Sequence, residues 1–290
     1  MTLLQKPFRA LVIGSSGTIG SALVSTLQMH SNCAEVMGIH RGSVPSIDYA
    51  DPSSIALAAE QLAVHQPFDL IINTIGVLHN QNVSPEKRLA DLRAAQLQEQ
   101  FLVNAIGPAL TISQFTKLLN PAGGIYATLS AKVGSISDNR LGGWYSYRSS
   151  KAALNMLIKT AAIELKRTMP RVALIAIHPG TVNSNLSKPF RGEEIGRDPQ
   201  QAANEILAVL LKVNTEDSGT FRSYSGEVIP WQLDSLLQLL CQAIATQPST
   251  LNGRVLQPIA THPYRNGWIK GKLALIGLLE FGVTPQMALV

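Results

Sequence analysis

The stretch Arg9-Ala-Leu-Val-Ile-Gly14-Ser-Ser16-Gly17-Thr18-Ile19-Gly20 decides the fold of this chain. Its apolar first half is typical of a buried strand over residues 9–13, and residues 18–29 predict the helix that follows. Three glycines between them let the backbone turn tightly and approach a pyrophosphate, which lies at the amino end of the helix. A tight turn alone would use the same glycines. Their place between a strand and a helix favours a dinucleotide site.

The same alternation of strand and helix continues along the chain. Further strands are predicted at 34–40, 70–74, 125–129 and 172–177. The helices expected between them run from Asp51 to His65, from a start at Ser84-Pro85-Glu86, and from Tyr147 through Glu164. Asp51 is the expected cap of the first of these, with Pro52 at its first position. The pattern predicts an α/β protein with a doubly wound parallel sheet, covered by helices on both faces.

Composition excludes several classes of function. A chain of 290 residues with 46% hydrophobic and 15% charged residues can bury a substantial core. The net charge of +5 is spread along the chain, without the dense basic runs of a nucleic-acid surface. Cys33 and Cys241 give neither a disulfide framework nor metal-ligand spacing. No apolar stretch is long enough to span a membrane, and no secretory signal precedes the first strand. We expect a cytoplasmic protein without a metal.

Tyr147 and Lys151 are four residues apart in a segment with helical composition. On a helix they lie on one face, where the ammonium favours the phenolate and lowers the pKa of the phenol. A tyrosine with a lowered pKa can exchange a proton near neutral pH. The spacing alone is weak evidence, since a packed ring beside a solvated amine has it too.

Arg41 and Asp48 follow the second predicted strand. An acid directly after this strand would bind an adenosine ribose and favour NAD(H). Arg41 stands there instead, and its guanidinium can form a forked contact with a 2′-phosphate, which favours NADP(H). A solvated loop arginine is the alternative. Asp48 can accept from the adenine amino group, or serve only in a turn.

Several motifs in the same order resemble the short-chain dehydrogenase/reductase superfamily, and within it the C-factor and sniffer-type carbonyl reductases. The motifs are the glycine loop, Asn73-Thr-Ile-Gly76, Asn104-Ala-Ile-Gly-Pro108, Tyr147-x-x-x-Lys151 and Pro179-Gly180-Thr181-Val182. The resemblance covers residues 8 to about 231 and implies a Rossmann-like domain over 1–231. It also implies hydride transfer between a nicotinamide and a small carbonyl or alcohol substrate, and a homodimer or homotetramer.

The resemblance assigns roles residue by residue. Tyr147 would give a proton to the carbonyl oxygen, and Lys151 would hold the nicotinamide ribose. Asn104 would anchor a water through a helix distorted before Pro108. The cofactor-binding residues would be Gly14, Ser16, Gly17, Thr18, Ile19, Gly20, Arg41, Asp48, Asn73, Gly76, Tyr147, Lys151, Pro179, Gly180, Thr181 and Val182, with Ser184 beside them. His178 is better read as a strand-end histidine than as a catalyst.

The carbonyl-orienting serine of the family has two possible positions in this chain. Counting forward along the fourth strand gives Ser130, whereas counting back from Tyr147 gives Ala131. Neighbouring residues of a strand point to opposite faces, so only one alignment holds. A bulge near Ala131 or Lys132 would favour Ser130, which we expect to be the catalytic serine, with Ser135 in reserve. The glycine loop also departs from the family, which usually has a glycine at the position of Thr18.

Residues 232–290 lie beyond the resemblance and form a C-terminal extension to which no function is assigned. Gln232–Ala245 and Trp268–Phe281 are its two apolar or amphipathic segments. Before the extension, the segment from Asn185 to Arg197 is the expected substrate lid. The sequence as a whole predicts an NADPH-dependent reductase of a ketone or aldehyde. The alternatives are an NADP-binding regulator without turnover and a C-factor-like signalling protein.

Overall fold

A computed structural model describes residues 2–4, 7–79 and 84–231 of the chain. Its first compact unit spans Met1–Asp234, and the second, Ser235–Val290, lies outside the described residues. The predicted segments Gln232–Ala245 and Trp268–Phe281 therefore lie outside them too. Among the described residues, no helix is both long and apolar enough to cross a bilayer.

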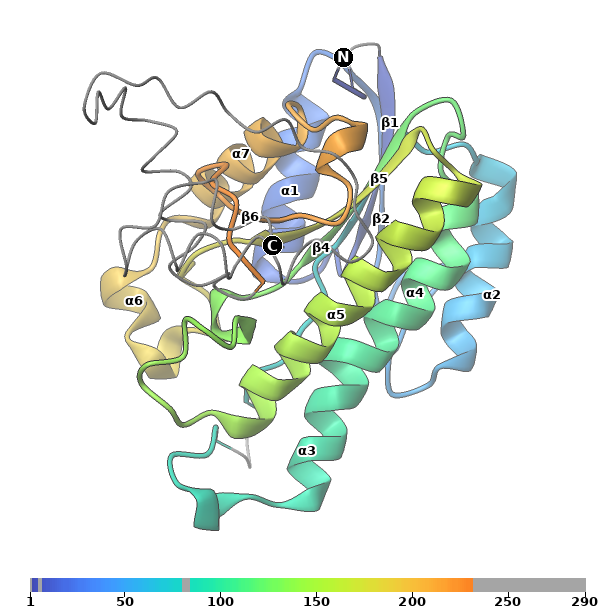
Figure 1. Cartoon of the computed structure of the whole chain (residues 1–290). Helices are drawn as coiled ribbons and strands as arrows, with labels where there is room; N and C mark the ends of the chain where they lie inside the picture. The colour runs from blue at the N-terminus through green and yellow to red at the C-terminus, as the bar shows by residue number, and fades with distance from the viewer. Residues whose placement is uncertain (1, 5–6, 80–83, 232–290) are drawn as a thin grey trace, which may run out of the picture. The chain divides into compact units, whose positions relative to one another are not determined.

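A parallel sheet forms the centre of the first unit (Figure 1). Its strands are β1 (Phe8–Ile13), β2 (Cys33–Ile39), β3 (Leu70–Asn73), β4 (Gly124–Leu129), β5 (Val172–His178) and β6 (Phe221–Ser223). They are ordered β2-β1-β3-β4-β5-β6, and each neighbouring pair is parallel. The five strands predicted from apolar runs are confirmed. Strand β6 was not predicted, because three residues are too few to show a pattern.

Helices cover both faces of the sheet (Figure 1). The helices of the described residues are α1 (Thr18–Met29), α2 (Ser53–Leu62), α3 (Ala94–Phe101), α4 (Gly107–Phe115), α5 (Tyr145–Thr168), α6 (Gly192–Ile195) and α7 (Pro199–Leu210). Buried side chains of α1 and α7 pack on one face, and those of α2, α4 and α5 on the other. Within β1, Ala10 and Val12 pack with the buried side chains of α1 and α7, whereas Leu11 and Ile13 pack with those of α2, α4 and α5. This alternation confirms the doubly wound α/β class.

The order of the strands reverses between β1 and β3. The chain leaves β1 toward β2 on one side and then returns to place β3 on the other side. The loops that follow these two strands therefore diverge, which opens a crevice at their carboxyl ends. The predicted glycine loop and the Asn73–Gly76 motif both emerge at this edge.

Two predicted helix starts need correction. The helix expected from Asp51 begins at Ser53, with Pro52 in the capping position. Asp51 still accepts a hydrogen bond from the Ser53 amide at 3.1 Å. The helix expected to open at Ser84-Pro85-Glu86 is not formed there, and α3 starts only at Ala94. Glu86 instead binds Ser146 at the start of α5, so a tertiary contact overrides the local helix signal.

Candidate functional site

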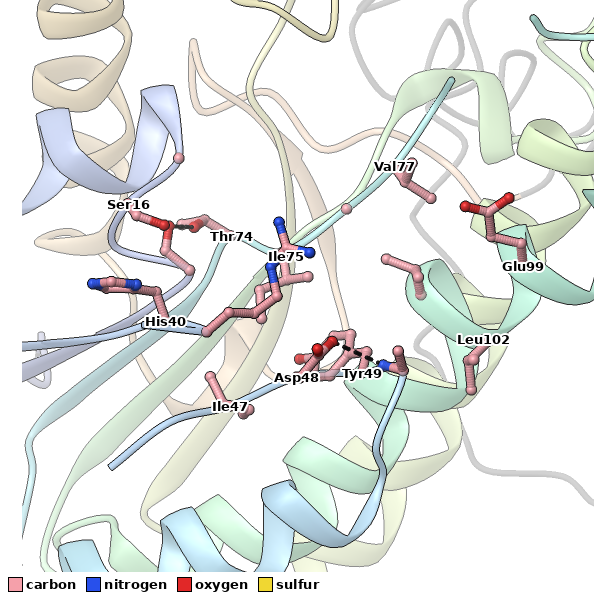
Figure 2. A pocket seen from close by; sticks show the side chains of 16 residues that line it. Ser16, His40, Ile47, Asp48, Tyr49, Thr74, Ile75, Val77, Glu99 and Leu102 are labelled. Atoms are coloured by element: carbon pink, nitrogen blue, oxygen red, sulfur yellow. Dashed lines mark hydrogen bonds between the residues drawn. The ribbon is translucent and has the colours of Figure 1, made fainter. Parts of the chain in front are cut away.

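A cavity of about 520 Å³ lies at the switch point between β1 and β3 (Figure 2). Its walls come from the loops after β1, β2 and β3 and from the end of α3. The lining residues are Gly14, Ser16, Gly17, His40, Arg41, Ile47, Asp48, Tyr49, Ala50, Thr74, Ile75, Gly76, Val77, Glu99, Leu102 and Val103. Five residues predicted to bind the adenosine and pyrophosphate parts of a cofactor thus share one cavity: Gly14, Ser16, Gly17, Arg41 and Asp48.

The glycine loop makes a close backbone cradle at one end of the cavity. Gly14 has a φ of +85°, and a Cβ atom there would lie 2.7 Å from the Thr74 hydroxyl oxygen. A Cβ atom at Gly20 would lie 2.2 Å from the carbonyl oxygen of Gly14. Gly17 caps α1 without any side-chain hydrogen bond. The first amides of α1 therefore remain available to an anion such as a pyrophosphate.

The residues after β2 form the opposite wall. Arg41 is exposed at the rim. Asp48 lines the cavity, but its Oδ1 atom accepts a hydrogen bond from the Ala50 amide at 3.0 Å. Asp48 therefore stabilises a turn and also lines the cavity. His40 also lines this wall, and its Nδ1 atom accepts from the Gly42 amide at 3.0 Å.

Asn73 supports the cavity from below and does not line it. Its side chain is fully buried, donates to the Tyr49 hydroxyl at 2.8 Å and accepts from the Ile75 amide at 3.1 Å. Both contacted residues line the cavity. Tyr49, which has no counterpart among the predicted site residues, is further held by the Thr111 hydroxyl at 2.8 Å. Only the tertiary structure reveals this network, since Tyr49 belongs to no motif.

Tyr147 and Lys151 lie on α5, one turn apart on the same face. The Lys151 ammonium lies 5.9 Å from the centre of the Tyr147 ring. It donates to the carbonyl oxygen of Leu129, at the end of β4, over 3.2 Å. Gly76 lies next to Lys151 and Asn104, because a Cβ atom there would lie 3.4 Å from Lys151 Nζ and 3.4 Å from Asn104 Oδ1. The structure thus brings Asn104, Lys151 and the Gly76 loop together.

The electrostatics of the pair differ from the sequence-based expectation. The ammonium was expected to lower the pKa of the phenol, but burial raises the pKa of Tyr147 to about 12. Burial also lowers the pKa of Lys151 to about 8, because the buried ammonium loses its hydration. Desolvation outweighs the attraction between the two groups at the distance that separates them. Lys151 is therefore a buried amine that releases its proton under mildly alkaline conditions.

Asn104 is completely buried where the helix is distorted, as expected. A π-helical stretch over Leu102–Ile106 joins α3 to α4, and Pro108 follows it without an amide proton. The Asn104 side chain accepts from the Val77 amide at 2.9 Å and donates to the Val77 carbonyl at 2.8 Å. It also donates to Gln100 and Ser150 at 2.8 and 3.2 Å. Asn104 therefore ties the loop after β3 to α5.

Ser130 follows β4 and is buried against α5. Its hydroxyl donates to the Asn155 Oδ1 atom at 2.6 Å. Asn155 is two turns after Tyr147 and one turn after Lys151, so the three residues form one stripe on the helix. Ala131 is extended at φ −141° and ψ 140° and points to the face opposite Ser130. The expected bulge is replaced by a single helical turn over Lys132–Gly134.

Ser135, the reserve candidate, lies after that turn. It is as deeply buried as Ser130. Its hydroxyl contacts the Ser137 hydroxyl and the Pro230 carbonyl, both at 3.3 Å. These contacts hold it toward the end of the described chain, whereas Ser130 faces the stripe of α5 that carries Tyr147.

The motif from Pro179 to Val182 forms the loop after β5. Gly180 has a φ of +72°, and a Cβ atom there would lie 2.8 Å from the Tyr224 ring. The Arg197 guanidinium donates to the Pro179 carbonyl and lies 3.5 Å from the centre of the Tyr224 ring. The Arg197 amide donates to the Thr181 carbonyl at 2.9 Å. Arg197 and Tyr224 thus hold the loop from Pro179 to Val182 in place.

His178 is the last residue of β5, as expected. Burial lowers its pKa to about 4, and the positive charges of Lys132 and Arg197 lower it further. Its Nδ1 atom accepts a hydrogen bond from the Lys132 amide at 3.4 Å. A neutral ring with this partner supports a structural role.

A series of ring contacts connects Tyr147 to the expected lid. The ring centres of Trp144 and Tyr147 are 6.2 Å apart, edge to face. Phe190, from the segment Asn185–Arg197, packs on Trp144 at 5.0 Å and on His79 at 5.6 Å. Trp144 has a φ of +54°, which is strained for a bulky side chain. Trp144, His79 and Phe190 have no predicted role, because their contacts join segments far apart in the chain.

Known proteins match this chain in sequence. A family model described as enoyl-(acyl carrier protein) reductase matches residues 20–213. A 1-hydroxy-2-glutathionyl-2-methyl-3-butene dehydrogenase of Rhodococcus sp. strain AD45 is 32% identical over 188 residues, which cover 64% of this chain and 79% of the relative. C-signal of Myxococcus xanthus is 30% identical over 166 residues, which cover 57% of this chain and 93% of the relative.

Solved structures match it in fold. Carbonyl reductase Sniffer of D. melanogaster superposes with a TM-score of 0.67 at 20% identity, over 78% of this chain and all of that chain. An NADPH-bound carbonyl reductase from chicken fatty liver superposes with a TM-score of 0.68 at 24% identity, over the same shares. At these identities, the likeness shows a common fold.

Proposed function

The chain belongs to the short-chain dehydrogenase/reductase family of oxidoreductases, and from its site we propose that it is an NADP(H)-dependent reductase of a ketone or aldehyde. The observation that carries the proposal is the placement of Tyr147 and Lys151. Both project from α5, and the Lys151 ammonium lies beside the Gly76 loop, which also lines the cavity at the switch point. This arrangement supports Tyr147 as a proton donor near the crevice in which doubly wound sheets commonly bind a dinucleotide.

The residues of the cavity fit a dinucleotide cofactor. The Gly14 cradle admits no side chain, and the amino end of α1 offers unpaired amides to a pyrophosphate. Gly14, Ser16 and Gly17 would hold the pyrophosphate, with Arg41 and Asp48 at the adenosine end. The loop from Pro179 to Val182, with Lys151, would hold the nicotinamide end. When bound, the nicotinamide supplies the hydride.

The residues of the chain supply position and protons. Tyr147 protonates the carbonyl oxygen as negative charge develops on it. Lys151 supports the charge of the phenolate that remains, and its own pKa of about 8 lets it exchange protons near neutrality. Asn104, whose side chain lies beside Gly76, would anchor a water that links Lys151 to solvent. Ser130 orients the carbonyl oxygen once its hydroxyl turns from Asn155.

Arg41 supports the preference for NADP(H). It stands exposed at the rim, where a forked guanidinium can meet a 2′-phosphate. The NADPH-bound state of the chicken carbonyl reductase agrees with this choice. Replacing Arg41 by Ala should weaken NADPH binding about ten-fold or more, the loss of a charge-assisted contact, and leave NADH binding unchanged. Equal losses for both cofactors in fluorescence titrations would contradict the preference.

The decisive experiment measures NADPH oxidation with a panel of ketones and aldehydes. Wild type should oxidise NADPH with at least one compound. Tyr147→Phe should lower turnover by about 10²–10⁴-fold, the usual share of general acid catalysis, and keep its affinity for NADPH. Tyr145→Phe is the matched control. Tyr145 is the first residue of α5 and is exposed, so this variant should keep full turnover.

A regulator without turnover is the second candidate. The specific observation in its favour is the Ser130 hydroxyl, which is bound to Asn155, with Ala131 at the alternative position. The similarity to C-signal points the same way. Tight NADPH binding with no oxidation for any carbonyl compound would support the regulator and overturn the reductase.

A further inference from the structure

Glu86 is a buried carboxylate to which the proposed reaction gives no role. Only 3% of it is exposed, and it lies in the irregular segment before α3. Both of its carboxylate oxygens meet Ser146: one accepts from the Ser146 amide at 3.2 Å and the other from the Ser146 hydroxyl. A carboxylate is costly to bury unless hydrogen bonds satisfy it. This one is satisfied by a residue 60 positions away in the chain.

Ser146 is the residue directly before Tyr147, in the first turn of α5. The first amides of a helix have no partners within the helix, and its amino end carries a partial positive charge. Trp144, in the capping position of α5, makes no side-chain hydrogen bond to these amides. Glu86 therefore caps the helix from a distant segment, with the sign of charge that a helix amino end favours.

A second bond from the same residue holds the backbone just before the helix. The Glu86 carbonyl oxygen accepts from the Trp144 amide at 2.5 Å. Trp144 has a φ of +54°, a strained conformation that persists only where neighbours impose it. Main chain and side chain of Glu86 thus clamp residues 144 and 146, and together they fix the direction in which α5 begins.

We propose that Glu86 is a positioning residue for Tyr147. The two halves of the Tyr147–Lys151 pair are held in different ways. Lys151 lies one turn inside α5 and is anchored by Leu129 at the end of β4. Tyr147 is the third residue of the helix, within the turn that frays most easily. Glu86 prevents that fraying. The inference rests on the proposed function insofar as it concerns proton transfer.

The test compares Glu86→Ala and Glu86→Gln with wild type. Loss of the cap in Glu86→Ala should make the amides of residues 144–148 exchange about five-fold faster or more. A proton donor displaced by about 1 Å costs about 10²-fold in rate, so single-turnover NADPH oxidation should slow to that extent. The affinity for NADPH should stay within about two-fold, because the pyrophosphate would be held at α1 and Lys151 keeps its own anchor at the Leu129 carbonyl. The amide oxygen of Glu86→Gln still accepts from Ser146 and should restore most of the rate.

Asp69→Ala is the matched control. Asp69 also accepts from one backbone amide, that of Arg9 at 2.9 Å, and from one side chain, Asn120 at 2.8 Å. It lies at the amino end of β3, the opposite edge of the sheet from the site. Its loss should leave both the exchange of residues 144–148 and the single-turnover rate unchanged.

Three outcomes would overturn the proposal: unchanged exchange at residues 144–148 in Glu86→Ala, an equal loss of rate in the Gln and Ala variants, or an equal loss in Asp69→Ala. If wild type reduces no carbonyl compound, the proposed function fails. Amide exchange in the variants still decides whether Glu86 holds Tyr147 in place.

Discussion

Burial acts in opposite directions on the protonation of Tyr147 and Lys151. Lys151 is almost fully buried and Tyr147 is partly buried, and burial favours the neutral form of each side chain. The pKa of the phenol rises to about 12, and that of the ammonium falls to about 8. A tyrosine that keeps its proton suits the role of a donor. The amine beside it changes charge close to physiological pH.

The lowered pKa of Lys151 predicts a dependence of stability on pH. The unfolded chain keeps this proton up to its ordinary pKa of 10.5, whereas the folded chain releases it near pH 8. Between these values the unfolded state binds more protons, so the free energy of unfolding rises with pH, by up to about 1.4 kcal/mol per unit. Above pH 10 the tyrosines with raised pKa reverse the trend.

Urea unfolding of Lys151→Met between pH 7 and 10 measures this contribution. The variant has no proton to lose at this position, so its stability relative to wild type should fall as pH rises from 8 to 10. Lys166→Met, at an exposed position of the same helix, should follow wild type at every pH. Parallel curves for wild type and Lys151→Met would show that Lys151 titrates normally.

The two buried serines after β4 predict different effects on turnover. Ser130→Ala removes a hydroxyl that faces the stripe of Tyr147 and Lys151. If this hydroxyl orients the carbonyl oxygen, its loss should lower turnover by about 10²-fold, as for other donors to a developing oxyanion. Ser135→Ala removes an equally buried hydroxyl directed at Pro230, and turnover should hardly change. A larger loss for Ser135→Ala would move the role to Ser135.

At the scale of elements, the sequence predicted structures with a regular pattern or a known motif, and it missed contacts between segments far apart in the chain. The five longer strands carry apolar runs because both of their faces are buried, and the glycine loop has its own spacing. Glu86 shows the limit: Ser84-Pro85-Glu86 has the composition of a helix start, yet the carboxylate that would cap its own segment caps α5 instead. The local pattern shows that this segment favours a helix. It does not show that Ser146, far along the chain, binds the carboxylate instead.

The same limit applies to the candidate site. The four-residue spacing of Tyr147 and Lys151 follows from helix geometry, so the sequence could place them on one face. Asn104 was joined to them only through the resemblance to the family. The partners of Ser130 and Asn73 come from other elements, and only the fold shows them. The serine alignment stayed open for a physical reason, since a turn at Lys132–Gly134 breaks the strand period on which the counting relied.

The segment Asn185–Arg197 is predicted to respond to ligand as one element. Its far end is tied to the loop after β5, where the Asn183 amide donates to the Arg197 carbonyl at 2.9 Å. Its middle rests on Trp144 through the Phe190 ring. Cofactor bound against the Pro179–Val182 loop should therefore stabilise the whole segment, and its amide exchange should slow on addition of NADPH.

Phe190→Ala tests how the segment is held. The variant should exchange faster over residues 185–197 without NADPH and lose part of the slowing with it, because its contacts to Trp144 and His79 are gone. Leu186→Ala, an exposed apolar position in the same segment, is the control. If NADPH leaves the amide exchange of residues 185–197 unchanged in wild type, that result would argue against a lid.

At the scale of the whole molecule, an apolar surface on α4 and α5 points to association. These helices pack side by side on the same face of the sheet (Figure 1). Met156 and Ile163, seven residues apart on one face of α5, are 62% and 54% exposed. Leu110 of α4 is exposed as well. Burying such side chains between two copies would stabilise a dimer through the helices that carry the site.

We therefore predict a homodimer or homotetramer that a single charge can dissociate. Ile163→Glu places a carboxylate in the centre of the apolar surface, where burial without a partner costs several kcal/mol, and the variant should be a monomer by light scattering. Val64→Glu introduces the same charge at a more exposed apolar position, 82% exposed, just after α2, and should leave the mass unchanged. A monomeric wild type, or an Ile163→Glu variant with the wild-type mass, would exclude this surface as the interface.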